Sequence, residues 1–409
     1  MNYRISHLDG IIDGTITIPA SKSISNRVLI IRALCKQEFR IKNLSESNDT
    51  KVLNYALSNY PEKININDSG TSMRFLTALL SIKETQYNIT GSEYMQKRPI
   101  GILVDSLRKL GAEIQYLKKT GFPPLEIHGK SLMGGEIDID AKISSQFISS
   151  LLLIAPTLRK GLVLNLKNRI VSKPYINMTL KLMSYFGILY SWSDNTITIP
   201  PQKYIAKDIT IEQDWSAVSF WCEIATLSKE TNLKLRNLNF ESIQGDRKGV
   251  NLFRDINFKK YHSGMQIKKN KHIEFKKIIN CVEVPDLAIP LIITLSITQN
   301  KSRFNGLETL AIKESNRIKA LKIEMLKYGT FLDEKQGEIS IQSSDVRVPK
   351  QIFNTYNDHR IAMSIAPLAL VFPVVIINNI DVVKKSYPNF WSDLKKVGFK
   401  ISPVTDLNI

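Results

Sequence analysis

Apolar and polar positions alternate along the chain with two different periods, one typical of helices and one typical of strands. Residues 103–110 and 178–186 repeat apolar side chains three and four positions apart, which predicts helices with one buried face. Residues 15–18, 161–166 and 196–199 are short runs rich in β-branched and aliphatic residues, which predicts strands. Because strands and helices alternate throughout, the pattern predicts an α/β protein and excludes the all-α and all-β classes.

Four segments share a helix that closes on glycine and then turns into a strand. The glycines are Gly111, Gly187, Gly329 and Gly398, separated by 76, 142 and 69 residues. Glycine after an apolar helical turn is the usual left-handed cap, although such corners also recur in unrelated α/β proteins. Because 142 is about twice 71, we predict six repeated units, three per half, with degenerate units before Asn65 and near residue 258.

Length and charge narrow the class of protein. A chain of 409 residues exceeds what one hydrophobic core usually supports, so two domains of roughly 200 residues are expected. The formal net charge of +18 favours an anionic partner, which charge alone leaves open as nucleic acid, an acidic membrane surface or a phosphorylated metabolite. Much of the excess lies in lysine runs such as 258–260 and 268–271, which are more typical of solvated surfaces.

The cysteine pattern and the apolar stretches predict a cytoplasmic chain. Three cysteines, Cys35, Cys222 and Cys281, are too few and too dispersed for a disulfide framework or a cysteine metal site. The N-terminus lacks the basic stretch and apolar core of a signal peptide. Residues 361–380 carry no charge, but their prolines and asparagines favour a buried helix ending near Leu370 and a strand at 374–377 over a membrane span.

At five places Ser, Thr, Gly or Asp gathers with a polar or cationic residue where a helix should begin. These segments are 21–27, 69–74, 144–146, 172–175 and 358–360. The helix dipole disfavours a cation in the first turn, so Lys22 and Arg27 there indicate that a negative ligand joins them. Five such starts predict a large polyanionic site.

Each motif alone also has an ordinary explanation. Residues 313–317 could form an exposed helical face with salt bridges, and Asp358 or Ser144 could simply cap a helix. Asp286 could belong to a turn and His359 could be a surface histidine. Only the order of the whole set along the chain favours function over these alternatives.

Taken in that order, the motifs resemble the enolpyruvyl transferase family, and within it the 5-enolpyruvylshikimate-3-phosphate synthases. The resemblance runs from about Asp13 to Val397, with a weak patch at 251–276 that suggests a divergent fifth unit. It rests on the motifs Ser-Lys-Ser-x-Ser-Asn-Arg at 21–27, Ser-Gly-Thr-x-Met-Arg at 69–74, Arg-Pro-Ile at 98–100 with Leu-x-x-Leu-Gly-Ala at 107–112, Ser-Ser-Gln-Phe at 144–147, Val-Ser-Lys-Pro-Tyr-Ile at 171–176, Val-Pro-Asp at 284–286, Lys-Glu-Ser-Asn-Arg at 313–317, Tyr-Asn-Asp-His-Arg at 356–360 and Lys-Ser-Tyr-Pro at 385–388.

The resemblance implies an inside-out α/β barrel fold of two similar domains, each with three small α/β units, and a ligand cleft between the domains. Residues 20–211 would form one domain, and residues 1–19 with 212–409 the other. The family moves the enolpyruvyl group of phosphoenolpyruvate to the 5-hydroxyl of shikimate 3-phosphate and releases phosphate. It implies no metal or organic cofactor, no nucleic-acid or membrane partner, and a monomer.

The family's functional residues can be placed on matching positions of this sequence. Shikimate 3-phosphate would be bound by Lys22, Ser23, Arg27, Ser144, Ser145, Ser172, Tyr175, Asp286 and Lys313. Phosphoenolpyruvate would be bound by Lys22, Gly70, Thr71, Arg98, Gln146, Arg317, Arg360 and Lys385. Catalysis would use Lys22, Asp286, Glu314 and His359, with Asp286 at the 5-hydroxyl, Glu314 at the methylene carbon, Lys22 stabilising developing charge and His359 donating to Glu314. The roles of Lys22, Asp286 and Glu314 in moving protons could be exchanged.

Departures from the family pattern and three rival functions remain. Asp68 stands beside Ser69 where a carboxylate would repel phosphate, Thr309 replaces an asparagine of some members, and Ala311 replaces a common arginine. The nearest rival is the enolpyruvyl transferase that acts on UDP-N-acetylglucosamine, which usually carries a cysteine in a mobile loop, whereas the three cysteines here lie in apolar stretches. A basic nucleic-acid-binding protein would interleave aromatic and basic residues on a surface, and a P-loop enzyme is suggested only by residues 129–131.

Overall fold

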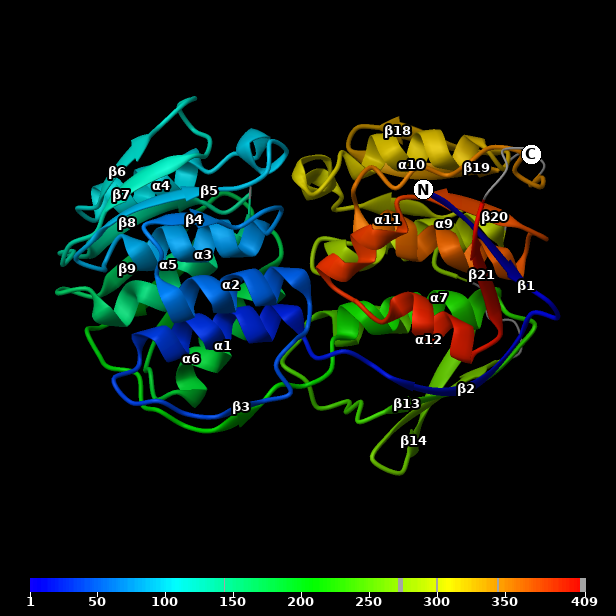
Figure 1. Cartoon of the computed structure of the whole chain (residues 1–409), viewed down its shortest axis with the longest axis horizontal. Helices are drawn as coiled ribbons and strands as arrows, with labels where there is room; N and C mark the ends of the chain where they lie inside the picture. Colours follow the sequence, from blue (N-terminus) through cyan, green and yellow to red (C-terminus); the bar gives the residue numbers. More distant parts are fainter. Residues whose placement is uncertain (143, 271–274, 299–300, 344–345, 405–409) are drawn as a thin grey trace. The chain divides into compact units, whose positions relative to one another are not determined.

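The computed structural model describes residues 1–142, 144–270, 275–298, 301–343 and 346–404. The chain folds into two compact units, residues 20–211 and residues 1–19 with 212–409. We call the first the inserted unit and the second the terminal unit, because the first interrupts the second along the chain. Figure 1 follows both units in the colours of the sequence.

The inserted unit contains six helices and ten short strands among its described residues. The helices are α1 (Lys22–Leu34), α2 (Asn48–Asn59), α3 (Gly70–Leu80), α4 (Gly101–Lys109), α5 (Ser145–Ile154) and α6 (Lys173–Tyr185). The strands are β3 (Ile41–Lys42), β4 (Lys63–Asn65), β5 (Gln86–Thr90), β6 (Glu113–Tyr116), β7 (Leu125–His128), β8 (Gly135–Asp140), β9 (Leu162–Lys167), β10 (Ser191–Ser193), β11 (Thr196–Ile199) and β12 (Ile209–Thr210).

The terminal unit alternates helix and strand in the same manner over its described residues. Its helices are α7 (Trp215–Leu227), α8 (Asp246–Gly249), α9 (Ala288–Ile297), α10 (Arg317–Leu326), α11 (His359–Ile365) and α12 (Phe390–Lys396). Its strands are β1 (Asn2–His7), β2 (Ile11–Thr17), β13 (Glu230–Arg236), β14 (Ile256–Tyr261), β15 (Gly264–Lys269), β16 (Ile278–Asn280), β17 (Arg303–Asn305), β18 (Thr330–Lys335), β19 (Glu338–Ser343), β20 (Val375–Asn378) and β21 (Phe399–Pro403).

A repeated small sheet confirms the unit that the glycine spacing predicts. The four-stranded sheets have the orders β4-β5-β7-β6, β8-β9-β11-β10, β2-β13-β15-β14 and β16-β17-β19-β18. In each of them two parallel strands are followed by an antiparallel hairpin. The remaining strands pair as β20-β1-β21 in the terminal unit and as β12-β3 in the inserted unit.

The four glycine corners are left-handed helix ends, as the sequence predicts. Gly111, Gly187, Gly329 and Gly398 have φ angles of 103°, 87°, 86° and 99°. At the first corner the amide of Ala112 donates to the carbonyl of Leu107 at 2.9 Å, which closes the helix end. The degenerate unit before Asn65 is present as well, because helix α2 ends at Tyr60, whose φ is 42°.

The divergent unit near residue 258 keeps its sheet but changes its helix. Strands β14 and β15 form a regular antiparallel hairpin there. The helix before them is reduced to α8 and a 3-10 turn at Val250–Leu252, after which Phe253 is extended. No glycine is therefore needed at this corner, which explains why the glycine series skips it.

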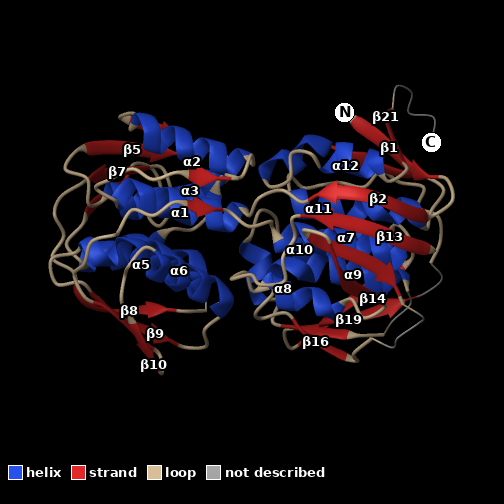
Figure 2. Cartoon of the chain, turned by 90° about the horizontal axis from the view of Figure 1, so that it is seen from below, coloured by secondary structure: helices blue, strands red, loops and turns tan. Residues whose placement is uncertain are grey.

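Helices form the interior of each unit, and the small sheets lie around them (Figure 2). All seven residues of α11 are buried, and so are nine of the ten in α9. The charge-free stretch 361–380 contains the end of α11, a 3-10 helix at Ala366–Leu370 and strand β20, as expected for buried structure. Within the described residues, no helix combines the length and the apolar character that a membrane span requires.

Candidate functional site

All five segments predicted to open helices do so. The residues that precede the first helical position are Ser21 before α1, Ser69 before α3, Ser144 before α5, Ser172 before α6 and Asp358 before α11. Four of these side chains accept a hydrogen bond from a backbone amide of the first turn. The exception is Ser172, which lies in the left-handed region with a φ of 57° and makes no capping bond. The helix starts therefore combine ordinary capping with an arrangement suited to anions.

Lys22 is the first residue of α1 and is held by an acidic neighbour. Its ammonium lies 3.2 Å from a carboxylate oxygen of Asp49, which is itself nearly fully buried on α2. Ser23, the next residue, is half-buried. The Asp49 pair compensates the charge of Lys22 in a first helical turn and fixes where its ammonium lies.

Arg27 is a buried cation held by neutral groups. Its guanidinium donates to the hydroxyls of Thr179 at 2.7 Å and Ser149 at 3.1 Å, and to the carbonyl of Ser23 at 2.8 Å. Burial lowers the pKa of Arg27 to about 10, because desolvation opposes its charged form. The hydroxyl groups orient this guanidinium without neutralising it, which suits interaction with an anion.

Two further cations converge on Gly70 at the start of α3. A Cβ placed on Gly70 would collide with the guanidinium groups of both Arg74 and Arg98. Arg98 is only 8% exposed, and its Nε and Nη1 atoms have no hydrogen-bond partner among the described residues. Buried donors of one charge around a bare backbone atom indicate a place for a phosphate or a carboxylate.

The polar residues of α5 are bound to this same helix start. The side-chain amide of Gln146 donates to the hydroxyl of Thr71 at 3.3 Å, which joins α5 to α3. Ser145 follows the Ser144 cap and is buried. This hydrogen bond places Gln146 beside Thr71, the residue that follows the glycine on which Arg74 and Arg98 converge.

The start of α6 contributes the last predicted residues of the inserted unit. Ser172 is 4% exposed, and Tyr175 is half-buried one turn further along the helix. The carbonyl of Tyr175 accepts a hydrogen bond from the Thr179 hydroxyl at 2.9 Å. The same hydroxyl oxygen accepts a hydrogen bond from the guanidinium of Arg27. Helices α1, α5 and α6 are therefore connected through buried hydroxyl groups next to the predicted residues.

The terminal unit brings together the other predicted charges as an ion-pair network around Asp286. One oxygen of Asp286 lies 2.9 Å from Arg360, and the other lies 3.6 Å from Arg317 and 4.0 Å from Lys313. Arg360 also donates to the backbone carbonyl of Asp286 at 3.0 Å. Asp286 thus lies among three cations from two segments, 313–317 and 358–360. Desolvation lowers the pKa of Lys313, and Asp286 opposes that shift.

Arg317 is the centre of this network and is 1% exposed. Its Nε lies 2.8 Å from Asp358, and its Nη2 lies 2.8 Å from Glu314. Burial alone would lower the pKa of Arg317, but these two carboxylates outweigh the desolvation and raise it. Lys385 extends the network, with its ammonium 4.0 Å from Glu314.

These contacts decide between the alternative interpretations of two motifs. Residues 313–317 are not an exposed helical face, because α10 begins only at Arg317 and that side chain is buried. Asp358 does cap α11, and it also binds Arg317 through both carboxylate oxygens. His359 is buried rather than exposed, with Nδ1 3.8 Å from Asp358. Its predicted bond to Glu314 stays a prediction.

Sequence reasoning gave no role to several residues that the geometry places at the site. Arg74 lies inside a quoted motif, and its position one turn after Gly70 is the signal that could have identified it. Asp49 carries no local signal, since its partner Lys22 lies 27 residues away.

The three positions that depart from the family pattern have ordinary surroundings. Asp68 accepts a hydrogen bond from Ser92. Thr309 is buried and Ala311 is exposed.

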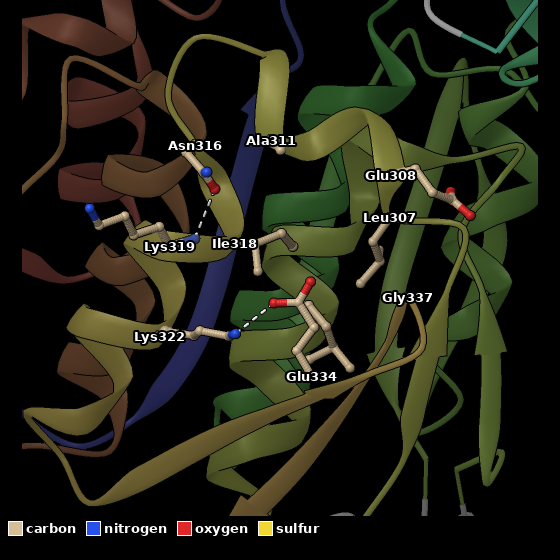
Figure 3. Close-up of a pocket in the computed structure, with 10 residues that line it drawn as sticks. Leu307, Glu308, Ala311, Asn316, Ile318, Lys319, Lys322, Glu334 and Gly337 are labelled. Carbon is tan, nitrogen blue, oxygen red and sulfur yellow. Dashed lines mark hydrogen bonds and ion pairs between the residues drawn. The ribbon is translucent and has the colours of Figure 1, made fainter.

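A separate pocket of about 320 Å³ lies in the terminal unit (Figure 3). It is lined by Leu307, Glu308, Ala311, Asn316, Ile318, Lys319, Lys322, Glu334, Gly337 and Ile339. Lys322 and Glu334 form an ion pair of 2.6 Å across it. This lining includes none of the predicted site residues, so the pocket is distinct from the charged network.

The structure excludes the P-loop alternative. Residues 129–131 follow strand β7 and open no helix, whereas a P-loop leads into one.

Comparison with known proteins assigns the family. The family model described as EPSP synthase (3-phosphoshikimate 1-carboxyvinyltransferase) matches residues 8–61 and 54–394. The chain belongs to the EPSP synthase family. A 3-phosphoshikimate 1-carboxyvinyltransferase of Bacteroides fragilis is 46% identical over 396 residues, which cover 95% of this chain and 96% of the relative.

More distant members of the EPSP synthase family agree over a similar length. The 3-phosphoshikimate 1-carboxyvinyltransferase of Buchnera aphidicola is 34% identical over 94% of this chain and 95% of its own. A solved EPSP synthase structure from Acinetobacter baumannii covers 98% of this chain and 100% of its own, with a TM-score of 0.78 and 21% identity. That likeness confirms the predicted fold class, the mixed α/β EPSP synthase fold.

Proposed function

We propose that this chain transfers the enolpyruvyl group of phosphoenolpyruvate to the 5-hydroxyl of shikimate 3-phosphate and releases phosphate. The observation that carries this proposal is the 46% identity, over 95% of the chain, to a 3-phosphoshikimate 1-carboxyvinyltransferase. The chemistry of the site supports it. Both substrates carry a phosphate and a carboxylate, and both units gather buried cations at helix starts.

The reaction is an addition followed by an elimination. The 5-hydroxyl oxygen adds to C2 of phosphoenolpyruvate while a proton reaches the methylene carbon, which gives a tetrahedral intermediate. Loss of phosphate and of a proton from the new methyl group restores the double bond. One group must therefore accept the hydroxyl proton and another must deliver and remove the carbon-bound proton.

The residues proposed for shikimate 3-phosphate are mainly neutral donors in the inserted unit. Ser144, Ser145 and Ser172 stand at the starts of α5 and α6, where backbone amides and hydroxyls suit a phosphate. Ser23 and Arg27 would bind the carboxylate, and Tyr175 would lie beside the ring. Asp286 and Lys313 of the terminal unit are assigned to the same substrate through the family resemblance.

The residues proposed for phosphoenolpyruvate carry most of the charge. Arg98 with Gly70, Thr71 and Gln146 would contribute from the inserted unit, and the convergence of Arg98 and Arg74 on Gly70 supports this assignment. Lys22 would contact both substrates. Arg317, Arg360 and Lys385 would contribute from the terminal unit, where their mutual repulsion is balanced by Asp286, Glu314 and Asp358.

The proton carriers are proposed from the same network. Asp286 would accept the proton of the 5-hydroxyl, and Glu314 would serve the methylene carbon, with His359 assisting Glu314. Glu314 would deliver a proton to that carbon in the addition and take one back in the elimination. Both carboxylates lie beside cations, Asp286 2.9 Å from Arg360 and Glu314 2.8 Å from Arg317. Lys22 would stabilise the charge that develops in the transition state.

The UDP-N-acetylglucosamine reaction is the second candidate, and the cysteines disfavour it. Cys222 and Cys281 are buried, and Cys35 is half-buried. Burial raises the pKa of the Cys281 thiol to about 12 and raises the pKa of the other two as well. A thiol that stays protonated is a poor nucleophile or proton donor near neutral pH, so none of the three fits a reactive role.

Substrate-dependent phosphate release tests the proposal. The purified chain should release phosphate from phosphoenolpyruvate only when shikimate 3-phosphate is present, and a carboxyvinyl ether product should appear by NMR. UDP-N-acetylglucosamine should not replace shikimate 3-phosphate. Release with the nucleotide sugar, or no release with either acceptor, would reject the assignment.

We also propose that the chain works as a monomer in the cytoplasm. The proposal includes no metal, organic cofactor, nucleic-acid or membrane partner. The separation of the three cysteines, all of them free thiols, supports a reducing compartment. Light scattering at micromolar concentration should give a mass near 46.5 kDa, and a value twice as large would reject the monomer.

A further inference from the structure

The segment that carries Asp358, His359 and Arg360 begins with two strained residues. Tyr356 and Asn357 have φ angles of 52° and 54°, in the left-handed region. Residues with a side chain adopt this region only where the surroundings hold them, and tyrosine is less suited to it than asparagine. Whatever holds these two residues therefore determines where Asp358 and Arg360 lie.

A buried carboxylate on α10 makes one of these attachments, beside the hydrogen bonds that the amide of Thr355 donates to Asn378 and that Asn379 donates to Asn357. One carboxylate oxygen of Glu324 accepts a hydrogen bond from the Tyr356 hydroxyl at 2.6 Å. The other oxygen accepts from the backbone amide of Asn354 at 2.9 Å. The ammonium of Lys327 lies 2.5 Å from the second oxygen and also donates to the carbonyl of Ile352 at 2.7 Å. Glu324 and Lys327 are 3% and 8% exposed at their side chains, so water competes little for these bonds.

The same helix also contacts the far end of the segment. Arg317, the first residue of α10, binds Asp358, whereas Glu324 lies about two turns further along the same helix. Residues 354–358 are thus attached at both ends to one rigid element. Arg360, which contacts Asp286, lies two residues after this doubly attached segment.

We propose that Glu324 and Tyr356 are positioning residues that hold the left-handed turn and thereby orient Arg360 in the cationic network. This inference rests on the proposed function, since Arg360 is assigned there to phosphoenolpyruvate. Neither residue is assigned any contact with a substrate.

The test is the Tyr356→Phe variant, which removes one hydroxyl and keeps the ring. The KM for phosphoenolpyruvate should rise about five- to tenfold, while the KM for shikimate 3-phosphate changes less than about twofold. Glu324→Ala should raise the same KM at least as much, and Glu324→Gln should restore part of it because its oxygen can still accept from Tyr356. An equal rise in both KM values, or a fall in melting temperature without a change in KM, would overturn the proposal.

Two comparisons isolate the effect from general damage to α10. Glu334→Gln removes the exposed ion pair between Glu334 of β18 and Lys322 of α10, which lies in the separate pocket of Figure 3. This variant should leave all kinetic constants unchanged. In an Arg360→Lys background, Tyr356→Phe should add little, because both changes act through one side chain. Fully additive effects would contradict the inference. Inactivity of the unmodified chain would instead reject the proposed function.

Discussion

The two units hold their predicted arginines by different means, although Lys22 of the inserted unit is paired with the carboxylate of Asp49. In the inserted unit Arg27 is oriented by hydroxyls and a carbonyl, and Arg98 lies against the bare backbone of Gly70. In the terminal unit Arg317 and Arg360 are bound directly to carboxylates. A cation held by neutral groups retains its attraction for a ligand, whereas one bound to a carboxylate must exchange or share its partner. The arginines of the inserted unit therefore keep more of their charge available to an anion, whereas those of the terminal unit are already compensated by carboxylates.

The largest effect should follow from removing the ammonium of Lys22. Lys22→Met keeps the side-chain length and loses the charge, so kcat should fall by at least about a thousandfold. The free energy of unfolding should also fall, because the nearly buried Asp49 loses its cation, although methionine keeps the packing of the aliphatic stem. Lys51→Met, at an exposed position of α2, is the matched control. A near-normal rate in Lys22→Met would remove Lys22 from catalysis.

One variant from each unit tests whether the two units differ in how their cations contribute to stability. Asp358→Asn should lower the free energy of unfolding by about 3 kcal/mol, because it leaves the buried Arg317 with reduced compensation. Arg98→Ala should cost no stability, because it relieves repulsion with Arg74 beside Gly70, yet it should raise the KM for phosphoenolpyruvate about tenfold or more. Denaturant unfolding and steady-state kinetics of both variants measure these effects. Equal losses of stability would show that the two units do not differ.

The pH dependence of stability should also lie in the terminal unit. Burial, followed by repulsion from Asp286, raises the pKa of the Asp246 carboxyl from 3.8 to about 7, while the Ser216 hydroxyl and Arg360 oppose that rise and Asp214 adds to it. Between about pH 4 and 7 the folded state keeps a proton that the unfolded chain has lost, so this group's contribution to stability falls as pH rises.

The variant Asp246→Asn should remove this dependence. Relative to the unmodified chain, it should gain about 3 kcal/mol of stability between pH 5 and pH 8. Unfolding curves at both pH values measure the difference. A constant difference between the two proteins would show that Asp246 does not titrate in this range.

The smallest effect concerns a single neutral donor. Ser145→Ala should raise the KM for shikimate 3-phosphate about fivefold, the loss expected for one hydrogen bond. Ser144→Ala should raise it similarly and should also cost about 1 kcal/mol of stability, because Ser144 caps α5. If Ser145→Ala instead raised only the KM for phosphoenolpyruvate, the assignment of the two substrates in this unit would be wrong.

Local features of the fold and site were predictable from sequence. The glycine corners depend on a conformation that glycine adopts readily, so Gly111 and Gly329 mark helix ends without knowledge of the fold. The cap at Ser21 and the cations of the first turn are likewise close in sequence. The corner at Tyr60 and the one after α8 carry no glycine, and for that reason they were inferred only from spacing.

The partners of these residues were not predictable, because they come from distant parts of the chain. Arg317 and Asp358 are 41 residues apart, and Arg360 lies 74 residues from Asp286. No sequence period relates such pairs, and the same residues would suit an exposed helix with local salt bridges.

The sequence by itself determined the α/β class, the repeated unit, the helix starts and, through family resemblance, the residue types expected at the site. Only the tertiary structure decided that Arg27 is held by hydroxyls, that Arg98 lies against Gly70, and that Arg317 is enclosed by carboxylates. Local propensity acts over a few residues, whereas the charge state and orientation of a buried side chain depend on which segments pack around it.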